Sequence, residues 1–210
     1  MVTSVRLRCA PLSVSRRISL EGACVVFSYC VENTSSDRVP WLWCWHPLMR
    51  MPTTPRLELS GFGPTLRPDN GFGVDLAGAW LWPPAEGPPS GGPRAGGPRA
   101  EGRADLRTLA IGEGRRSVKL FAERTDTIGR VALADESTGS RLSIDLESEH
   151  LRGLGLWINR GGWNGYTHVA LEPSTVPFER PTDSPGDRGV WLDGHAAVEF
   201  EMPVTLSTIG

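Results

Sequence analysis

Glycine and proline interrupt this chain so often that a long amphipathic helix has no place to form. The 210 residues include 25 glycines and 18 prolines. No window of a dozen residues keeps an apolar period of 3.6 without one of them. Short segments in which apolar and polar residues alternate are frequent instead. The sequence therefore predicts an all-β protein, an antiparallel β-sandwich or barrel of many short strands.

Strands are expected wherever such a segment is bounded by turn residues. The segments 18–20 and 23–29 are separated by Glu21-Gly22, which predicts a hairpin. Residues 135–140 are turn formers between two further strands. The other strands are expected at 4–9, 56–60, 117–123, 128–134, 141–146, 154–158, 166–172 and 197–205.

One segment differs from the rest in composition. Residues 83–102 contain six prolines and six glycines, and Gly-Gly-Pro-Arg-Ala occurs at both 91–95 and 96–100. Such a segment buries too little apolar surface to offset the entropy of ordering it. Too few strands precede it to close a core alone. We therefore expect one β-sandwich domain over residues 1–210, with a flexible insertion at about 83–103.

The charge balance excludes several classes of partner. With 22 Lys+Arg against 24 Asp+Glu, the net charge is −2, which provides no electrostatic footprint for nucleic acid or an anionic membrane. No apolar run has the length of a membrane span or a signal peptide, so a cytoplasmic location is expected. In that compartment we expect buried, reduced thiols at Cys9, Cys24, Cys30 and Cys44.

A tryptophan-rich stretch at 40–49 contains the first candidate for chemistry. If it is extended, Leu42, Cys44 and His46 share one face, and the opposite face holds Trp41, Trp43 and Trp45. Pro47 then ends the strand at His46. A histidine there can donate a proton near neutral pH. The structural alternative is a histidine that caps the strand through a backbone hydrogen bond.

The second candidate is a carboxylate at the end of the expected strand 166–172. Strand alternation places Tyr166, His168, Ala170 and Glu172 on one face. Glu172 could act there as a general base, or it could be a solvated residue of an edge strand. Two upstream tryptophans are either core residues or platforms for a sugar ring, with asparagines nearby to bind hydroxyls: Trp157, Trp163, Asn159 and Asn164.

Other motif classes have little support. The four histidines show no metal-ligand spacing, and the cysteines lie far from three of them. No Gly-x-Ser-x-Gly motif indicates a nucleophilic serine. We therefore expect neither a metal nor a cofactor.

Together, the two stretches resemble the aldose 1-epimerase (galactose mutarotase-like) family. Residues 29–49 resemble its strand, turn and His-Pro element, and residues 154–177 resemble its tryptophan strand and its Leu-Glu-Pro strand end. The resemblance implies a β-supersandwich that interconverts sugar anomers without a metal, nucleotide or covalent intermediate. By motif match, His46 is the acid that protonates the ring oxygen, and Glu172 is the base at the C1 hydroxyl.

The chain departs from the family pattern in two places. Family members carry an N-terminal sheet region with a second histidine and an arginine that bind the sugar, and no counterpart is found here. His168 is a candidate replacement because it shares a face with Glu172, although no family motif supports it. Leu48-Met49 replaces the usual aromatic residue after His-Pro. A shortened homologue, a fragment and a binding remnant all remain open, as does a homodimer through an open sheet edge.

Three hypotheses follow for the function. The first is a mutarotase-like isomerase that uses His46 and Glu172, with Trp157, Asn159, Trp163 and His168 binding the sugar. The second is a non-catalytic carbohydrate-binding β-sandwich. The third is a domain whose exposed tryptophans at 41–45 dock a partner protein. The first requires that His46 and Glu172 face one cavity, with a gap between them that suits a pyranose.

Overall fold

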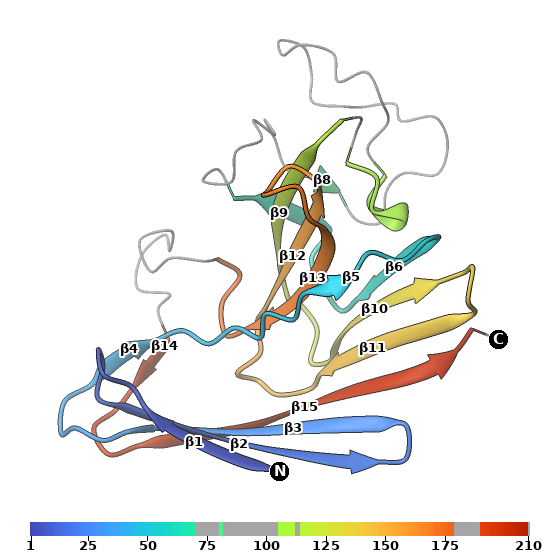
Figure 1. Ribbon diagram of the computed structural model, residues 1–210. Helices are drawn as coiled ribbons and strands as arrows, with labels where there is room; N and C mark the ends of the chain where they lie inside the picture. The colour runs from blue at the N-terminus through green and yellow to red at the C-terminus, as the bar shows by residue number, and fades with distance from the viewer. Residues whose placement is uncertain (70–79, 82–104, 112–113, 179–189, 210) are drawn as a thin grey trace, which may run out of the picture.

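Two antiparallel sheets account for most of the residues in the computed structural model, which describes 1–69, 80–81, 105–111, 114–178 and 190–209 (Figure 1). In spatial order, the larger sheet consists of β1 (Val2–Arg6), β2 (Leu12–Glu21), β3 (Cys24–Asn33), β15 (Ala197–Thr208), β11 (Ser140–Leu146), β10 (Gly129–Asp135) and β6 (Pro55–Ser60). The smaller sheet consists of β5 (Met49–Arg50), β13 (Thr167–Ser174), β12 (Gly153–Arg160), β9 (Arg116–Glu123), β7 (Thr65–Pro68) and β8 (Trp80–Leu81). The predicted all-β antiparallel sandwich is confirmed.

The remaining elements are short. A separate ribbon pairs β14 (Val190–Leu192) with β4 (Val39–Trp41), and the 3-10 helix η1 spans Leu106–Thr108. In the described part of the chain, no helix combines the length and the apolar character needed to cross a membrane. The expected insertion at 83–103 lies outside the described residues.

The predicted hairpin is formed by β2 and β3, and Gly22 adopts a φ of 64° in its turn. A second turn, between β10 and β11, is organised by Asp135. Its carboxylate accepts hydrogen bonds from the hydroxyl and amide of Ser137 and from the amides of Thr53 and Thr54. These bonds, above all the one from the Ser137 hydroxyl, lower the pKa of Asp135 to about 2. One carboxylate thus connects the β10–β11 turn to the segment before β6.

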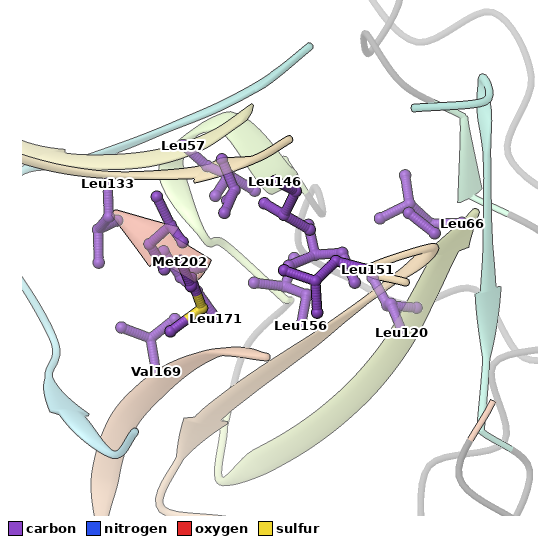
Figure 2. Packing of buried hydrophobic residues seen from close by; sticks show 14 of the residues in the cluster. Leu57, Leu66, Leu120, Leu133, Leu146, Leu151, Leu156, Val169, Leu171 and Met202 are labelled. Carbon is purple, nitrogen blue, oxygen red and sulfur yellow. The ribbon is translucent and has the colours of Figure 1, made fainter. Parts of the chain in front are cut away.

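The hydrophobic core lies between the two sheets, where their apolar faces meet (Figure 2). The larger sheet contributes Leu57, Leu133, Leu146 and Met202, and the smaller sheet contributes Leu120, Leu156, Val169 and Leu171. Burying each such side chain stabilises the fold by about 1.5–3 kcal/mol. The core therefore occupies one face of the smaller sheet and leaves its other face for different residues.

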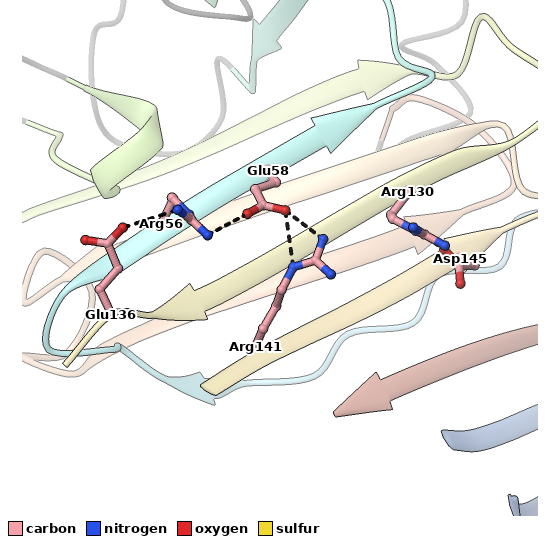
Figure 3. Close-up of polar contacts among 6 residues, drawn as sticks. All are labelled: Arg56, Glu58, Arg130, Glu136, Arg141 and Asp145. Carbon is pink, nitrogen blue, oxygen red and sulfur yellow. Dashed lines mark hydrogen bonds and ion pairs between the residues drawn. The ribbon is translucent and has the colours of Figure 1, made fainter. Parts of the chain in front are cut away.

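The outer face of the larger sheet carries charged side chains (Figure 3). Glu58 of β6 binds Arg141 of β11 at 2.7 Å and Arg56 at 3.2 Å, and Arg56 also approaches Glu136. Arg130 pairs with Asp145 on the neighbouring strands. Arg141 and Asp145 are partly buried, while the other four side chains are more exposed. Ion pairs at such a surface contribute little stability, so their main consequence is a solvated outer surface.

The tryptophan-rich stretch is not a continuous strand. Only 39–41 and 49–50 pair in ladders, and between them Cys44 forms a single bridge with Ser174. His46 therefore lies in an irregular segment and not at the end of a strand.

The tryptophan rings of this stretch also point inward. Trp41 is buried, and Trp43 and Trp45 pack against Tyr29 and Phe27 at centroid distances of 4.7 and 5.3 Å. Exposed rings at 41–45 would have favoured the hypothesis that they dock a partner protein, and the burial of Trp41 and the partial burial of Trp43 and Trp45 do not provide that support.

Two further expectations concern exposure. None of the four cysteines forms a disulfide, but Cys9 and Cys44 are exposed and Cys24 and Cys30 are only partly buried, so the expected burial is wrong. At one edge of the larger sheet all five residues of β1 are exposed. An exposed edge of this kind can pair with another strand, and the predicted homodimer stays a prediction.

Candidate active site

The face of the smaller sheet that points away from the core gathers most of the side chains singled out in the sequence. Strand alternation and the register of β13, β12 and β9 place twelve residues on it, and the nine in the rows of His168, Ala170 and Glu172 are called the site face. This site face comprises His168, Ala170 and Glu172 of β13, Gly155, Trp157 and Asn159 of β12, and Ser117, Lys119 and Phe121 of β9.

His46 reaches the site face because its segment runs beside the end of β13. The Trp45 amide donates to the carbonyl of Pro173 at 2.9 Å, and the Thr175 amide donates to the carbonyl of Trp43 at 3.0 Å. The rings of Trp43 and Trp45 pack toward the core, so the residues between and after them point the other way. Inward packing of the tryptophans therefore turns the His46 side chain toward Glu172.

His46 and Glu172 touch. The distance from His46 Nε2 to Glu172 Oε1 is 3.2 Å, with 41% of the histidine side chain exposed and 1% of the glutamate side chain. The prediction that they meet around one site agrees with this geometry. The expected gap for a pyranose between them is wrong, because the two groups are in direct contact. A sugar could enter between them only if the His46 ring moved outward.

The two oxygens of Glu172 have different surroundings. Oε2 lies 3.1 Å from Nζ of Lys119, which is itself buried, and accepts a long hydrogen bond of 3.8 Å from the Cys44 thiol. Oε1 is buried and has no hydrogen bond with acceptable geometry, despite its short distance to His46. Oε1 of Glu172, on the side of His46, can therefore accept a further hydrogen bond.

Gly155 makes room for this carboxylate. A Cβ at this position would lie 2.9 Å from Glu172 Oε2 and 3.1 Å from Glu172 Cβ. Neither Gly155 nor Lys119 is among the candidate site residues that the sequence predicts. A glycine inside a strand is a recognisable signal of close approach by another group, and here that group is the Glu172 side chain.

Replacing Gly155 with alanine is expected to displace the carboxylate and to reduce any Glu172-dependent activity by about 100-fold, because a shift of about 1 Å costs that much at a catalytic centre. Steady-state kinetics measures the loss. Gly63→Ala is the matched control, since its Cβ would meet nothing closer than 3.4 Å. Equal activity in both variants would contradict this role of Gly155.

Trp157 lies between His46 and His168. Its indole is buried and donates to the hydroxyl of Ser117 at 2.8 Å. Its ring lies edge-on to the rings of His46, His168 and Trp163, at centroid distances of 5.5, 4.4 and 5.3 Å. Trp157 is thus a buried residue that packs against the rings of the site. Trp163, in contrast, is 42% exposed and presents its ring to solvent.

The side chain of Asn159 forms hydrogen bonds with the backbone of Trp163, in the turn between β12 and β13. Its Nδ2 donates to the carbonyl of Trp163 at 3.1 Å, and its Oδ1 accepts from the Trp163 amide at 2.9 Å. The side chain is fully buried. This geometry favours a role in positioning Trp163 over the direct contact with sugar hydroxyls that the sequence suggested.

His168 is buried on the same face, and its Nε2 has no hydrogen-bond partner. Burial, and to a smaller extent the charge of His46, lowers the pKa of His168 below its ordinary value. The ring is therefore neutral at neutral pH and offers an unsatisfied nitrogen beside Trp157. A ligand hydroxyl could fill that position.

The lowered pKa of His168 predicts a pH dependence of stability. The unfolded histidine takes up a proton near its ordinary pKa of about 6.5, whereas the folded one resists, so stability is lost as the pH falls through this range. Urea unfolding at about pH 7.5 and pH 5 should show a larger loss for the wild type than for His168→Gln. An identical loss in both proteins would contradict the burial effect.

Two other features lie outside this site. Among the described residues, no group of three or more His, Cys, Asp or Glu could hold a metal ion. An open hollow of about 640 Å³ is lined by residues of β6 and by Arg107, and it shares no residue with the site face. The site face itself brings an imidazole and a carboxylate into contact beside aromatic rings.

Comparison with known proteins extends only to the fold. No protein-family model matches the chain, and no curated protein does. A galactose mutarotase-like protein from Clostridium acetobutylicum has a similar structure, with a TM-score of 0.63 at 13% identity over 99% of this chain and 61% of that one. A proposed aldose 1-epimerase from Escherichia coli K12 has a TM-score of 0.60 at 16% identity over 99% of this chain and 64% of that one.

A similar fold also occurs in a protein that is not described as an epimerase or a mutarotase. A TPR-domain containing protein from Parabacteroides distasonis has a TM-score of 0.62 at 13% identity, covering 100% of this chain and 32% of that one. The chain spans 49% to 64% of the length of the aldose 1-epimerase and galactose mutarotase-like structures that it matches. At such identities the likeness establishes the galactose mutarotase-like sandwich fold. An activity has to be argued from the residues of the site.

Proposed function

We propose that this protein is an aldose mutarotase-like isomerase that interconverts sugar anomers by acid–base catalysis with His46 and Glu172. The observation that carries the proposal is the 3.2 Å approach of His46 Nε2 to Glu172 Oε1. A proton donor and a proton acceptor, 126 positions apart in the sequence, meet on one face of a sheet beside aromatic rings. The similar fold of galactose mutarotase-like proteins supports the choice of reaction.

The reaction needs both groups at once. Glu172 Oε1 takes the proton of the C1 hydroxyl while protonated His46 donates its proton to the ring oxygen, so the bond from C1 to the ring oxygen breaks and C1 becomes an aldehyde. Rotation about the C1–C2 bond then presents the other face of the aldehyde. During ring closure His46 takes back the proton of the C5 hydroxyl and Glu172 gives its proton to the C1 oxygen, so the products are the opposite anomer and the enzyme in its starting protonation state.

The direct contact between His46 and Glu172 means that the sugar must separate them. His46 lies on the irregular segment between β4 and β5, outside any strand ladder, so its ring can move without breaking a sheet hydrogen bond. The C1 hydroxyl then supplies the hydrogen bond that Oε1 lacks. Trp157 supports the ring from below, and His168 offers its unpaired Nε2 to another hydroxyl.

A second candidate function is sugar binding without turnover. Trp163 is 42% exposed, and its ring lies 6.1 Å from that of the exposed Tyr166. Two neighbouring aromatic rings at the surface suit the apolar face of a sugar. This alternative needs the aromatic platform but neither His46 nor the base.

One experiment separates the two candidates. Polarimetry of freshly dissolved α-D-glucose and α-D-galactose measures interconversion with and without the protein, and calorimetry measures binding of the same sugars. We expect a rate above that of buffer alone and a loss of this excess in Glu172→Gln. If the sugars bind but the rate of interconversion does not exceed that of buffer, the protein binds sugar without turnover and the isomerase proposal is contradicted. Absence of both for these sugars and their phosphates would contradict either function.

A further inference from the structure

The chain contains one lysine among 21 arginines, and that lysine is buried on the site face. Only 4% of the Lys119 side chain is exposed, and the mechanism above does not use it. A buried ammonium is costly unless it is paired. Lys119 Nζ lies 3.1 Å from Glu172 Oε2 and 5.6 Å from the centre of the Phe121 ring. Its surroundings are therefore built to hold a positive charge beside Glu172.

The type of cation matters at this position. An arginine guanidinium commonly binds both oxygens of a carboxylate at once, whereas a lysine ammonium is a compact charge that can bind one. Lys119 contacts Oε2, and Oε1 on the His46 side has no hydrogen bond. Gly155 leaves space on the Oε2 side. Lysine therefore neutralises the carboxylate without occupying the oxygen that the proposed reaction uses.

The charge balance around Glu172 also depends on Lys119. Among the described residues, the titratable groups that face this part of the site are Lys119 of β9, Cys44 and His46 of the segment before β5, and His168 of β13. Without Lys119, the described part of the chain would leave His46 as the one cation in contact with the buried Glu172 carboxylate. Glu172 would then take up a proton, or His46 would be held in its protonated form, and either state removes one half of an acid–base pair.

We propose that Lys119 is the positioning residue of this site: it keeps Glu172 ionised, directs Oε1 toward the substrate, and leaves His46 free to exchange its proton. The catalytic meaning of this role rests on the proposed function. Its electrostatic part concerns Glu172 and Lys119 alone, so it can be tested without any sugar.

The test combines two variants with NMR of labelled side chains. With ¹³C-labelled glutamate, the Glu172 carboxyl signal is identified by its absence in Glu172→Gln and is followed as the pH changes. In Lys119→Met, Glu172 should take up its proton about 1 to 3 pH units higher than in the wild type, and the acid limb of kcat/KM should move by the same amount. In Lys119→Arg, Glu172 should stay ionised while kcat falls at least about 10-fold, because the guanidinium engages Oε1 as well.

A second measurement covers the case in which Lys119→Met does not fold. Protein grown with ¹⁵N-labelled lysine carries one labelled side chain, so the Lys119 ammonium can be titrated without ambiguity. Removing the charge of Glu172 by Glu172→Gln should make Lys119 lose its proton at lower pH.

The outcomes separate this proposal from the proposed function. If Glu172 titrates at the same pH in the wild type and Lys119→Met, or Lys119 at the same pH in the wild type and Glu172→Gln, the electrostatic role is overturned. A uniform loss of activity with an unchanged pH profile would overturn it as well. If the wild type does not interconvert anomers but both titrations shift, the proposed function fails while the pairing of Lys119 with Glu172 stands.

Discussion

Replacing Glu172 with glutamine is expected to lower the rate of anomer interconversion by about 100- to 10,000-fold, the usual contribution of a general base. Glutamine has nearly the shape of glutamate but cannot accept the proton of the C1 hydroxyl. Oε1 is the buried acceptor beside His46, whereas Glu123, which strand alternation places farther along the same face, has a half-exposed side chain and pairs with Arg67. Polarimetry at several protein concentrations measures the catalysed rate above that of buffer.

The fold must be checked alongside, because the substitution leaves the Lys119 charge without its partner. Removing one member of a buried ion pair typically destabilises a protein by about 3–5 kcal/mol. The double variant Lys119→Met/Glu172→Gln removes both charges and should regain part of that stability. Glu199→Gln, at an exposed carboxylate of β15, is the matched control and should keep full activity. A folded Glu172→Gln with wild-type rate would exclude Glu172 as the base.

Replacing His46 with asparagine is expected to reduce kcat by about 100- to 10,000-fold while sugar affinity changes by only a few fold. Asparagine can still donate a hydrogen bond to the ring oxygen, but it cannot transfer a proton at neutral pH. The ring lies 5.5 Å from that of Trp157, which stays in place to support the sugar. Progress curves over a range of sugar concentrations separate kcat from KM.

A matched control exists for this substitution too. His195 is exposed and adopts a φ of 58°, a conformation that asparagine tolerates well, so His195→Asn should leave kinetics and stability nearly unchanged. A raised KM with unchanged kcat in His46→Asn would make His46 a substrate contact. Loss of kcat alone supports its role as the acid.

The fold was accessible from the sequence because its signals are local. Alternation between apolar and polar residues marked most strands of both sheets, and turn residues such as Gly22 and Asp135 marked where the chain reverses. The error at 40–49 has a local cause as well. Alternation continues through this stretch, but most of it forms no ladder, so a periodic pattern alone could not show that His46 lies outside a strand.

The candidate site was accessible in part. Strand parity correctly grouped His168 with Glu172, and the motif resemblance selected His46. Lys119 and Gly155 were missed because their importance depends on what lies opposite them in the neighbouring strands. The sequence does carry one signal for Lys119, because it is the single lysine of the chain beside 21 arginines.

The sequence by itself determined the class of fold, most strand positions and which side chains share a face, because a residue's side of a strand depends only on its neighbours in the chain. Only the tertiary structure decided that His46 touches Glu172 without a gap, that Lys119 takes one carboxylate oxygen, and that Asn159 serves a turn. These contacts join segments that are remote along the chain. They depend on sheet register and on how the tryptophan rings pack, which no local pattern encodes.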